Sequence, residues 1–587
     1  MRDLATCETL AATWSELPFD DETRAKCSAL LASPSDGSIR TALTQAERAE
    51  RLLGHFGADL TFGTAGLRAV MGVGTNRANS YTFAAVTRAI AQVLKTENKN
   101  SKDTSVVIGY DGRQHSDSFA RQTAAILSKE GFHIYLFDRI VPTPVVPFAV
   151  TRLKARLGVM ITSSHNSAEY NGYKVYNQYG GQITSPFDRD VMVQCKNQKP
   201  EKIPTLSDTD VEWLREDMLR IYIDWVLKTA NYADDKKIKI VYTPLHGAAG
   251  ALTRSIFYKA GFINFQTVNE QADPHIKFPT VKAPNPENAD SWQLAFDLSH
   301  QIQSDVVLAN DGDGDRIGVG YLKNDRYTVL TGNQTGTLLL YYLLKKLKAT
   351  GVLSNHDFAL STVVSTPLAK KICEYFSIRY IETLTGFKNM GEAAEAACAQ
   401  NPTSKMILAF EEAFGVTMAD SRDKDGMVSA LLAASIASEF QGRGISHYLD
   451  EIESRFGVYR EDQIDVEFAE SDGPDKMKSV VEKIRAQIPN QCIGEKVVRV
   501  RDFKKRTEVV NSVERSMTAF AEQNLIHLET SEGSWIAVRP SGTEPKLKVY
   551  LGVVIQSNDA SKDESREIKA LQKLELLKIW VNESLLS

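Results

Sequence analysis

The chain contains a series of apolar runs that each end in a polar loop, and stretches of helix formers separate them. Residues 105–109 lead into Tyr-Asp-Gly-Arg, and residues 158–161 lead into a Thr/Ser/Asn cluster. The order recurs where residues 237–242, 305–309 and 406–410 run into Thr/His-containing or acidic loops. Alternating strand and helix signals predict α/β units with mostly parallel sheets. Ligands bind at the carboxyl ends of such strands, so these loops are the candidate sites.

The length of 587 residues is too great for one hydrophobic core, and three to five domains are expected. Residues 1–57 are polar and rich in helix formers, which predicts a helical appendage that packs on the first domain. The last 130 or so residues instead resemble an α+β domain, since strand-like runs flank a Pro/Gly turn. A closing amphipathic helix is predicted there from apolar residues at helical spacing, namely Ile568, Leu571, Leu574, Leu577 and the neighbouring Trp580.

Charge and composition exclude several classes of function. The net charge of −5 gives no electrostatic case for binding nucleic acid. No apolar stretch is long enough to span a bilayer, and the N-terminus has no signal-type apolar region. The six cysteines are scattered without a C-x-x-C pair, so neither disulfides nor a zinc site are expected. We therefore expect a cytoplasmic protein without a nucleic-acid or membrane partner.

The run Thr-Ser-Ser-His-Asn at residues 162–166 places a possible nucleophile, Ser164, beside a possible base, His165. No Gly-x-Ser-x-Gly elbow surrounds it, so an acyl-transfer hydrolase is poorly supported. The run follows a strand candidate, which predicts an exposed loop. A Ser-rich turn alone is more often structural, and the chemistry depends on what the rest of the chain supplies.

The acidic loop at residues 310–316 predicts a metal site. Asp311, Asp313 and Asp315 alternate with glycines, so their carboxylates can converge on one hard cation such as Mg²⁺ or Ca²⁺. An EF-hand is excluded, because Arg316 stands where that loop needs Gly and Leu322 where it needs Glu. Three such close carboxylates repel one another unless a cation or Arg316 compensates, which favours a metal site over a solvated turn.

Further loops carry groups suited to phosphates and sugars. Residues 539–545 join two strand candidates and combine Arg, Ser, Gly and Thr, a set that can bind a phosphate monoester. The adjacent Glu411 and Glu412 follow an apolar strand and could bind sugar hydroxyls. Weaker signals surround Thr385 and Lys424. Candidates for proton transfer or charge neutralisation are His165, Lys174, Arg68 and Lys424.

Taken in order, these motifs resemble the α-D-phosphohexomutase superfamily from about residue 58 onward. Residues 62–68, 278–282 and 410–413 resemble its phosphoglucomutase-2 and phosphopentomutase branch, which also includes a glucose-1,6-bisphosphate synthase. The resemblance implies four domains around a central cleft, three mixed-sheet α/β domains and a C-terminal α+β domain. The implied boundaries are residues 1–57 for the helical appendage, 58–210, 211–328 and 329–455 for the α/β domains, and 456–587 for the α+β domain.

The resemblance also implies roles for the matching residues. Ser164 would carry the transferable phosphoryl group, with Lys174 and His165 as acid/base groups. Arg68 and Arg316 would stabilise its charge. One Mg²⁺ would be bound by a phosphate oxygen on Ser164 and by three carboxylates, those of Asp311, Asp313 and Asp315. Those that hold the sugar are Glu411 and Ala413, aided by Thr385 and Lys424, while Arg539, Ser541, Gly542 and Thr543 hold the non-transferring phosphate.

The expected activity is interconversion of glucose 1-phosphate and glucose 6-phosphate, with glucose 1,6-bisphosphate or a similar compound as activator and a monomer or weak homodimer as the assembly. Two residues depart from the family pattern. Ser167 replaces a Pro, which would leave its loop looser, and Ala413 replaces a Ser that contacts the sugar. Alternatives are therefore phosphopentomutase, then phosphomannomutase or the bisphosphate synthase. A catalytically silent relative and a metal-dependent phosphatase are the rivals of another class.

Overall fold

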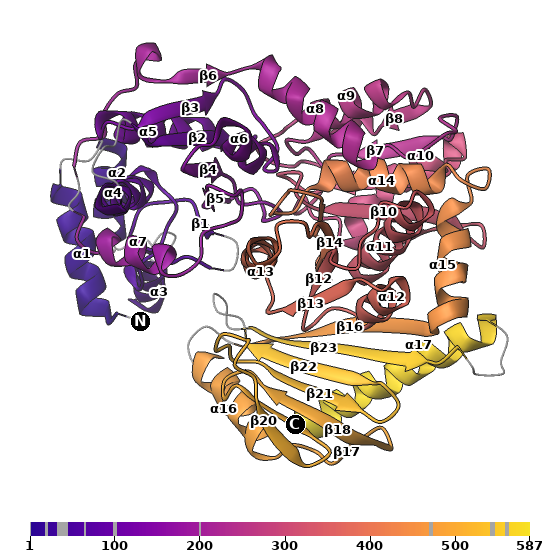
Figure 1. Cartoon of the computed structure of the whole chain (residues 1–587). Helices are drawn as coiled ribbons and strands as arrows, with labels where there is room; N and C mark the ends of the chain where they lie inside the picture. Colours follow the sequence, from indigo (N-terminus) through magenta and orange to yellow (C-terminus); the bar gives the residue numbers. More distant parts are fainter. Residues whose placement is uncertain are drawn as a thin grey trace. The chain divides into compact units, whose positions relative to one another are not determined.

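The computed structural model describes residues 2–17, 21–31, 45–63, 66–97, 103–198, 201–468, 473–540, 546–557 and 563–586. The chain divides into two compact units, which are considered separately below. Unit 1 comprises Met1–Gly320 and Gly415–Ser435, and unit 2 comprises Tyr321–Phe414 and Ile436–Ser587. Each unit contains more than one sheet (Figure 1).

Unit 1 begins with three helices, as predicted for this part of the chain. Trp14 is the centre of their small apolar core, where its ring packs edge-on against Phe56 at 5.5 Å and Tyr81 at 6.2 Å. Because Tyr81 belongs to the helix that follows, the N-terminal segment is fixed to the first α/β layer. The helices are α1 (Leu4–Glu16), α2 (Asp21–Leu31) and α3 (Gln45–Phe56).

The first sheet has the strand order β1-β5-β4-β2-β3-β6 and mixes parallel with antiparallel pairs (Figure 1). Strands β4 and β2 pair in parallel with Tyr110 opposite Ile161, so the loops after them begin side by side. The strands are β1 (Leu67–Val70), β2 (Ser105–Tyr110), β3 (His133–Phe137), β4 (Leu157–Ile161), β5 (Tyr170–Asn177) and β6 (Glu212–Leu214). The helices are α4 (Ser80–Glu97), α5 (Ser116–Lys129), α6 (Val145–Leu153) and α7 (Phe187–Cys195).

The second sheet of unit 1 has β9 at its centre, parallel to β7 and antiparallel to β10. Asn310 ends β9 opposite Ile317, which begins β10, and the acidic loop is the turn between them. Its strands are β7 (Ile240–Thr243), β8 (Phe265–Thr267), β9 (Val306–Asn310) and β10 (Ile317–Lys323), and its helices are α8 (Glu216–Ala230), α9 (Gly250–Ala260) and α10 (Gln293–Ile302). The later segment of unit 1 holds β15 (Val416–Met418) and the start of α14 (Gly426–Ala437).

Unit 2 contains a third α/β layer, in which β12 pairs in parallel with both β13 and β14. Strand β14 is fully buried and ends at Phe410, so Glu411 begins the loop at its carboxyl end. The strands of this layer in unit 2 are β12 (Phe358–Thr362), β13 (Arg379–Thr383) and β14 (Met406–Phe410). Strand β11 (Arg326–Val329) does not belong to this layer and is instead hydrogen-bonded to β10. The helices are α11 (Gly332–Ala349), α12 (Leu368–Phe376), α13 (Phe387–Gln400) and α15 (Gly444–Phe456).

The chain ends in an antiparallel sheet of order β16-β23-β22-β21-β18-β19-β20, and β17 pairs with β18 (Figure 1). The helices α16 (Gly473–Ala486) and α17 (Asp563–Trp580) contribute to its core. The strands are β16 (Val458–Glu467), β17 (Gln491–Cys492), β18 (Glu495–Asp502), β19 (Thr507–Val510), β20 (Val513–Ser516), β21 (Ile526–Thr530), β22 (Trp535–Pro540) and β23 (Lys546–Ile555). The predicted class, α/β domains followed by an α+β domain, is confirmed.

The closing helix α17 was predicted correctly, but its predicted core face was wrong. Leu574 and Leu577 are buried in the sheet core as expected. Ile568 and Leu571 are 53% and 46% exposed, because the core face continues through Ala570 instead. No helix among the described residues is long and apolar enough to cross a membrane.

Candidate active site

The loop after β4 holds Ser164 in a strained conformation. Its φ is 56°, in the left-handed region that residues with a Cβ rarely adopt, and such strain clusters at functional sites. The Ser164 N–H donates to Oγ1 of Thr162 at 2.9 Å, which helps to hold the turn. The side chain of Ser164 is buried rather than exposed as the sequence had suggested.

Arg113 is the main support of this loop. Its Nη2 donates to the carbonyl oxygens of Ser164 at 2.6 Å and Asn166 at 2.5 Å, and its Nη1 donates to those of Ser167 at 2.7 Å and Tyr170 at 3.2 Å. The guanidinium group thus provides hydrogen bonds to four backbone carbonyl oxygens in the segment that follows β4. Ser167, which the sequence analysis noted as a departure from the family pattern, therefore has a specific backbone contact.

Asp111 joins the two neighbouring loops. Its Oδ2 accepts from Thr162 Oγ1 at 2.6 Å and its Oδ1 from Ser116 Oγ at 2.7 Å. Burial raises the pKa of Asp111, although Arg113 opposes this shift. The carboxyl group therefore acts as a fixed hydrogen-bond centre beneath the Ser164 loop.

The acidic loop after β9 lies directly against Ser164. The Ser164 hydroxyl donates to Asp311 Oδ2 at 2.9 Å. Asp311, Asp313 and Asp315 are all buried, and each offers a carboxylate oxygen within 4.8 Å of the others, so they form a candidate metal site. The close approach requires glycine at position 312, because a Cβ there would lie 2.6 Å from the carbonyl oxygen of Ser164.

Lys174 on β5 compensates the charge of this cluster. Its buried ammonium donates to Asp313 Oδ2 at 2.8 Å and to Asp315 Oδ2 at 2.7 Å, while Thr143 Oγ1 also donates to Asp313 Oδ2 at 2.6 Å. Burial alone would lower the pKa of Lys174, but the two carboxylates outweigh it and the pKa is raised. The pKa of Asp311, by contrast, is raised well above its usual value by burial and by its two acidic neighbours.

Two guanidinium groups and an imidazole complete this part of the site. Arg68 Nη1 donates to Asn166 Oδ1 at 3.3 Å, and Arg316 pairs with Glu287 at 2.5 Å. The His165 Nδ1 lies 3.4 Å from the Ser164 hydroxyl oxygen. Desolvation, followed by the charges of Arg316 and Arg68, lowers the pKa of His165 well below its usual value. These surroundings therefore favour the neutral form of the His165 imidazole.

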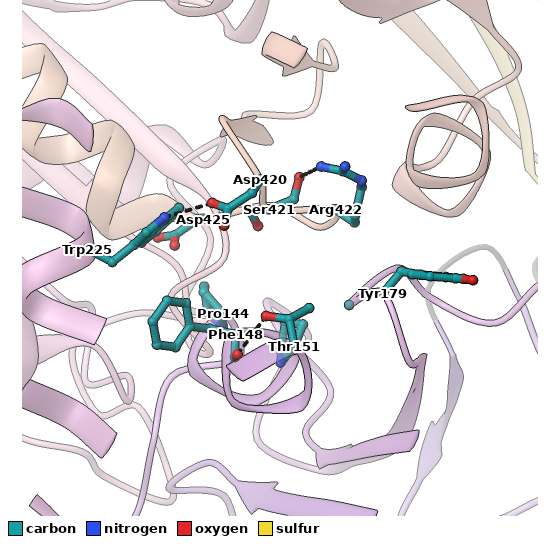
Figure 2. Close-up of a pocket in the computed structure, with 11 residues that line it drawn as sticks. Pro144, Phe148, Thr151, Tyr179, Trp225, Asp420, Ser421, Arg422 and Asp425 are labelled. Atoms are coloured by element: carbon teal, nitrogen blue, oxygen red, sulfur yellow. Dashed lines mark hydrogen bonds between the residues drawn. The ribbon is translucent and has the colours of Figure 1, made fainter. Parts of the chain in front are cut away.

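Lys424 lies in the same unit, within a segment that follows β15. Its Nζ is 3.5 Å from Asp315 Oδ2. Neighbouring positions anchor the segment. Tyr222 donates to Asp425 Oδ2 at 2.7 Å. Trp225 Nε1 donates to Asp420 Oδ1 at 2.8 Å (Figure 2). The structure thus places Lys424 beside the acidic cluster. The sequence analysis named it both as a candidate for charge neutralisation and as an aid to sugar binding.

The remaining candidates that the structure describes belong to unit 2. Glu411 and Ala413 follow β14, and Thr385 follows β13. Arg539 lies at the end of β22. Burial raises the pKa of Tyr550, the carboxylates of the β14 loop raise it further, and the charge of Arg539 opposes the shift. Unit 2 therefore brings the sugar-loop and phosphate-loop arginine candidates to one region. Ser541, Gly542 and Thr543 lie outside the described residues.

Known families match this chain over most of its length. The four domains of the phosphoglucomutase/phosphomannomutase family, α/β/α domains I, II and III and the C-terminal domain, match residues 59–202, 220–323, 331–456 and 495–564. The chain belongs to the phosphoglucomutase/phosphomannomutase family. This confirms the predicted superfamily and its four-domain architecture, and the chain is an enzyme of the mutase class.

Relatives that are named for different activities are similar to this chain. A phosphoglucomutase of Staphylococcus haemolyticus is 31% identical over 86% of this chain and 92% of its own length. A human phosphopentomutase is 32% identical over 85% and 86%, and a mouse glucose 1,6-bisphosphate synthase is 32% identical over 84% and 83%. The crystal structure of a putative phosphomannomutase from Thermus thermophilus shares the fold, with a TM-score of 0.64 and 20% identity over 88% of this chain and 99% of that one.

The sequence analysis assigned no function to several residues that hold this site. Asp111 and Arg113 lie in the loop after the first predicted strand, so the strand-end rule pointed to them without giving a role. Thr143 had no such signal, since only its contact with Asp313 shows its importance. Tyr222 likewise supports Lys424 from a helix distant in the sequence.

We expect Arg113→Lys to lower turnover about 100-fold, because one ammonium cannot bind the four carbonyls and a misplaced reacting group loses about that much rate. Steady-state kinetics and amide hydrogen exchange over residues 162–167 measure the two effects. The exposed Arg139, which pairs with Asp138, provides the matched control Arg139→Lys. Unchanged turnover and unchanged exchange in Arg113→Lys would contradict the supporting role.

Proposed function

We propose that this mutase interconverts glucose 1-phosphate and glucose 6-phosphate, with Ser164 as the carrier of the transferable phosphoryl group. The observation that carries the proposal is the 2.9 Å hydrogen bond from the Ser164 hydroxyl to Asp311 within a buried acidic cluster. An unmodified serine gains little from such surroundings. A phosphorylated one would place its oxygens where a cation held by the cluster could bind them.

Phosphoryl transfer asks the protein mainly for positioning and charge stabilisation. In the proposed cycle the bond from phosphorus to Ser164 Oγ breaks as one forms to a sugar hydroxyl, which gives a bisphosphorylated sugar. The sugar hydroxyl loses its proton and the departing Ser164 Oγ gains one. The imidazole of His165, whose Nδ1 lies 3.4 Å from that oxygen, can take up the first proton and return one to Ser164. The other phosphate then returns to Ser164 after the sugar has turned round. Arg68 and Arg316 stabilise the moving negative charge.

The acidic loop fits Mg²⁺. Asp313 Oδ1 and Asp315 Oδ1 are buried without a hydrogen-bond partner, although their Oδ2 atoms bind Lys174. These oxygens and a carboxylate oxygen of Asp311 would hold the ion, which when bound neutralises phosphate charge. The raised pKa of Lys174 keeps its ammonium charged, so we assign Lys174 to charge compensation ahead of proton transfer.

The sugar-binding assignments rest on the family resemblance. Glu411, aided by Thr385 and Lys424, would bind sugar hydroxyls, and Ala413 would line the same position. The Thr385 Oγ1 is buried without a partner, which leaves it available to a ligand. Arg539, Ser541, Gly542 and Thr543 would hold the non-transferring phosphate. We also propose activation by glucose 1,6-bisphosphate or a similar compound and a cytoplasmic location.

The second candidate function is phosphopentomutase, which Ala413 favours. The absence of a Ser hydroxyl there removes one sugar contact, so discrimination between a hexose and a pentose would weaken. The human phosphopentomutase is as similar to this chain as the phosphoglucomutase of Staphylococcus haemolyticus is. Phosphomannomutase and glucose-1,6-bisphosphate synthase rank after it. A silent relative is less consistent with a buried cluster in which Ser164, Lys174 and the aspartates are all retained.

A covalent phosphate on Ser164 is the first expected outcome. Intact-mass analysis after incubation with glucose 1,6-bisphosphate should show one added phosphate, and Ser164→Ala should lose both the phosphate and at least about 10⁴-fold in turnover, because no carrier remains. Ser163→Ala is the matched control and should keep the modification. Full turnover by Ser164→Ala would refute the phosphoserine cycle.

Removal of divalent metal should abolish turnover, and Mg²⁺ should restore it. Binding to the folded state alone also raises the melting temperature, so Mg²⁺ should stabilise the wild type but not Asp311→Asn. Glu216→Gln, which alters an exposed carboxylate paired with Arg139 outside the cluster, is the control. Equal turnover with and without metal, together with no thermal shift, would count against the site.

Substrate preference is tested by comparing kcat/KM for glucose, mannose and ribose 1-phosphates. We expect glucose to be the best substrate, and Ala413→Ser to widen the ratio of glucose to ribose by about tenfold, as one added sugar hydrogen bond allows. Ala413→Gly adds no hydroxyl and is the control. A clear ribose preference in the wild type would establish the pentomutase alternative instead.

A further inference from the structure

Helix α17 is apolar on two opposite faces. One face carries Ala570, Leu574 and Leu577, which are at most 5% exposed and belong to the core of the C-terminal sheet. The opposite face carries four large apolar side chains that are 46–59% exposed, namely Ile568, Leu571, Leu576 and Ile579. A helix that covers a sheet normally presents polar residues outward. Four apolar side chains on one exposed helical face indicate a surface that binds a partner.

The order of residues along this exposed face is a palindrome. Residues 568–579 read Ile-x-x-Leu-Gln-x-x-Glu-Leu-x-x-Ile, which has the same pattern of apolar and polar positions in both directions. The midpoint lies between Lys573 and Leu574. A rotation of about 100° per residue places Ile568, Gln572, Glu575 and Ile579 along one line, with Leu571 and Leu576 on its two flanks.

A palindromic face is complementary to itself. We propose that α17 pairs with α17 of a second copy of this chain, antiparallel and about a two-fold axis. Under that symmetry Ile568 faces the partner's Ile579, and Gln572 faces the partner's Glu575. Glu575 accepts from Lys578 Nζ of its own helix at 2.9 Å, and its other carboxylate oxygen can accept from the carboxamide of the partner's Gln572, so the polar centre of the interface is satisfied. On one flank of the interface Leu571 lies beside the partner's Leu571, and on the other flank Leu576 lies beside the partner's Leu576.

The pattern favours a second copy over other occupants. A two-fold interface requires that contacts recur at equal distances on either side of a centre, and an unrelated partner requires no such symmetry. A lipid surface would not favour a Gln and a Glu at the middle of the buried line. A pair of single helices is small beside the roughly 1,200 Å² that stable interfaces bury, so the dimer should dissociate at about micromolar concentration.

The test is sedimentation velocity of the full-length protein over a range of concentrations, with variants at the polar centre. Gln572→Lys places an ammonium opposite the partner's Glu575 twice per dimer and should tighten the dimer roughly tenfold, in a salt-dependent way. Gln572→Glu places two carboxylates opposite each other and should weaken it by a similar factor. Ile579→Glu should abolish it.

Tyr258 is 84% exposed and lies in unit 1, so Tyr258→Glu provides the control and should leave the dimer unchanged. Retained mutase turnover and unchanged melting temperature would show that each variant folds. A disulfide between subunits in Gln572→Cys/Glu575→Cys, absent from either single variant, would report the antiparallel register. A wild type that stays monomeric at all concentrations overturns the proposal. So does a dimer in which Gln572→Lys and Gln572→Glu act alike.

Discussion

The ammonium of Lys174 holds the buried acidic cluster of the candidate site together. It lies between Asp313 and Asp315, and without it two buried carboxylates would repel each other in a medium that screens charge poorly. Breaking such a buried pair by removing one partner costs about 3–5 kcal/mol. Lys174 is on strand β5 of the first sheet, and the aspartates follow strand β9 of the second. The same contact therefore fixes the acidic loop against the first sheet.

The conformation of Ser164 depends on this arrangement and on Arg113. A left-handed serine is unfavourable by itself, and surrounding contacts must determine it. Arg113 binds the backbone on both sides of the turn, and Thr162 and Asp311 bind the serine itself. The hydroxyl is therefore aimed at the acidic cluster before any substrate arrives, which reduces the ordering that catalysis would otherwise require.

Local patterns in the sequence indicated which loops form the candidate site, but not the contacts that hold these loops. The strand before Ser164 and the acidic loop were both recognisable, because period and loop composition are local properties. The partners of Lys174 and the role of Arg113 were not, since they depend on residues that only the sheets bring together. Helix α17 shows a related limit. Spacing identified the helix but not which apolar side the sheet would cover, because both sides were apolar.

The segment Gly415–Ser435 belongs to unit 1, although it follows almost a hundred residues of unit 2 along the chain. A fragment that ended at Gly320 would keep Ser164 and the aspartates but would lack Lys424 and the Asp425 that binds Tyr222. Unit 1 is therefore complete only after the first segment of unit 2, Tyr321–Phe414, has been synthesised. The enzyme cannot gain its charge-balanced centre by simple growth from the N-terminus, and any attempt to dissect it must keep a discontinuous piece of chain.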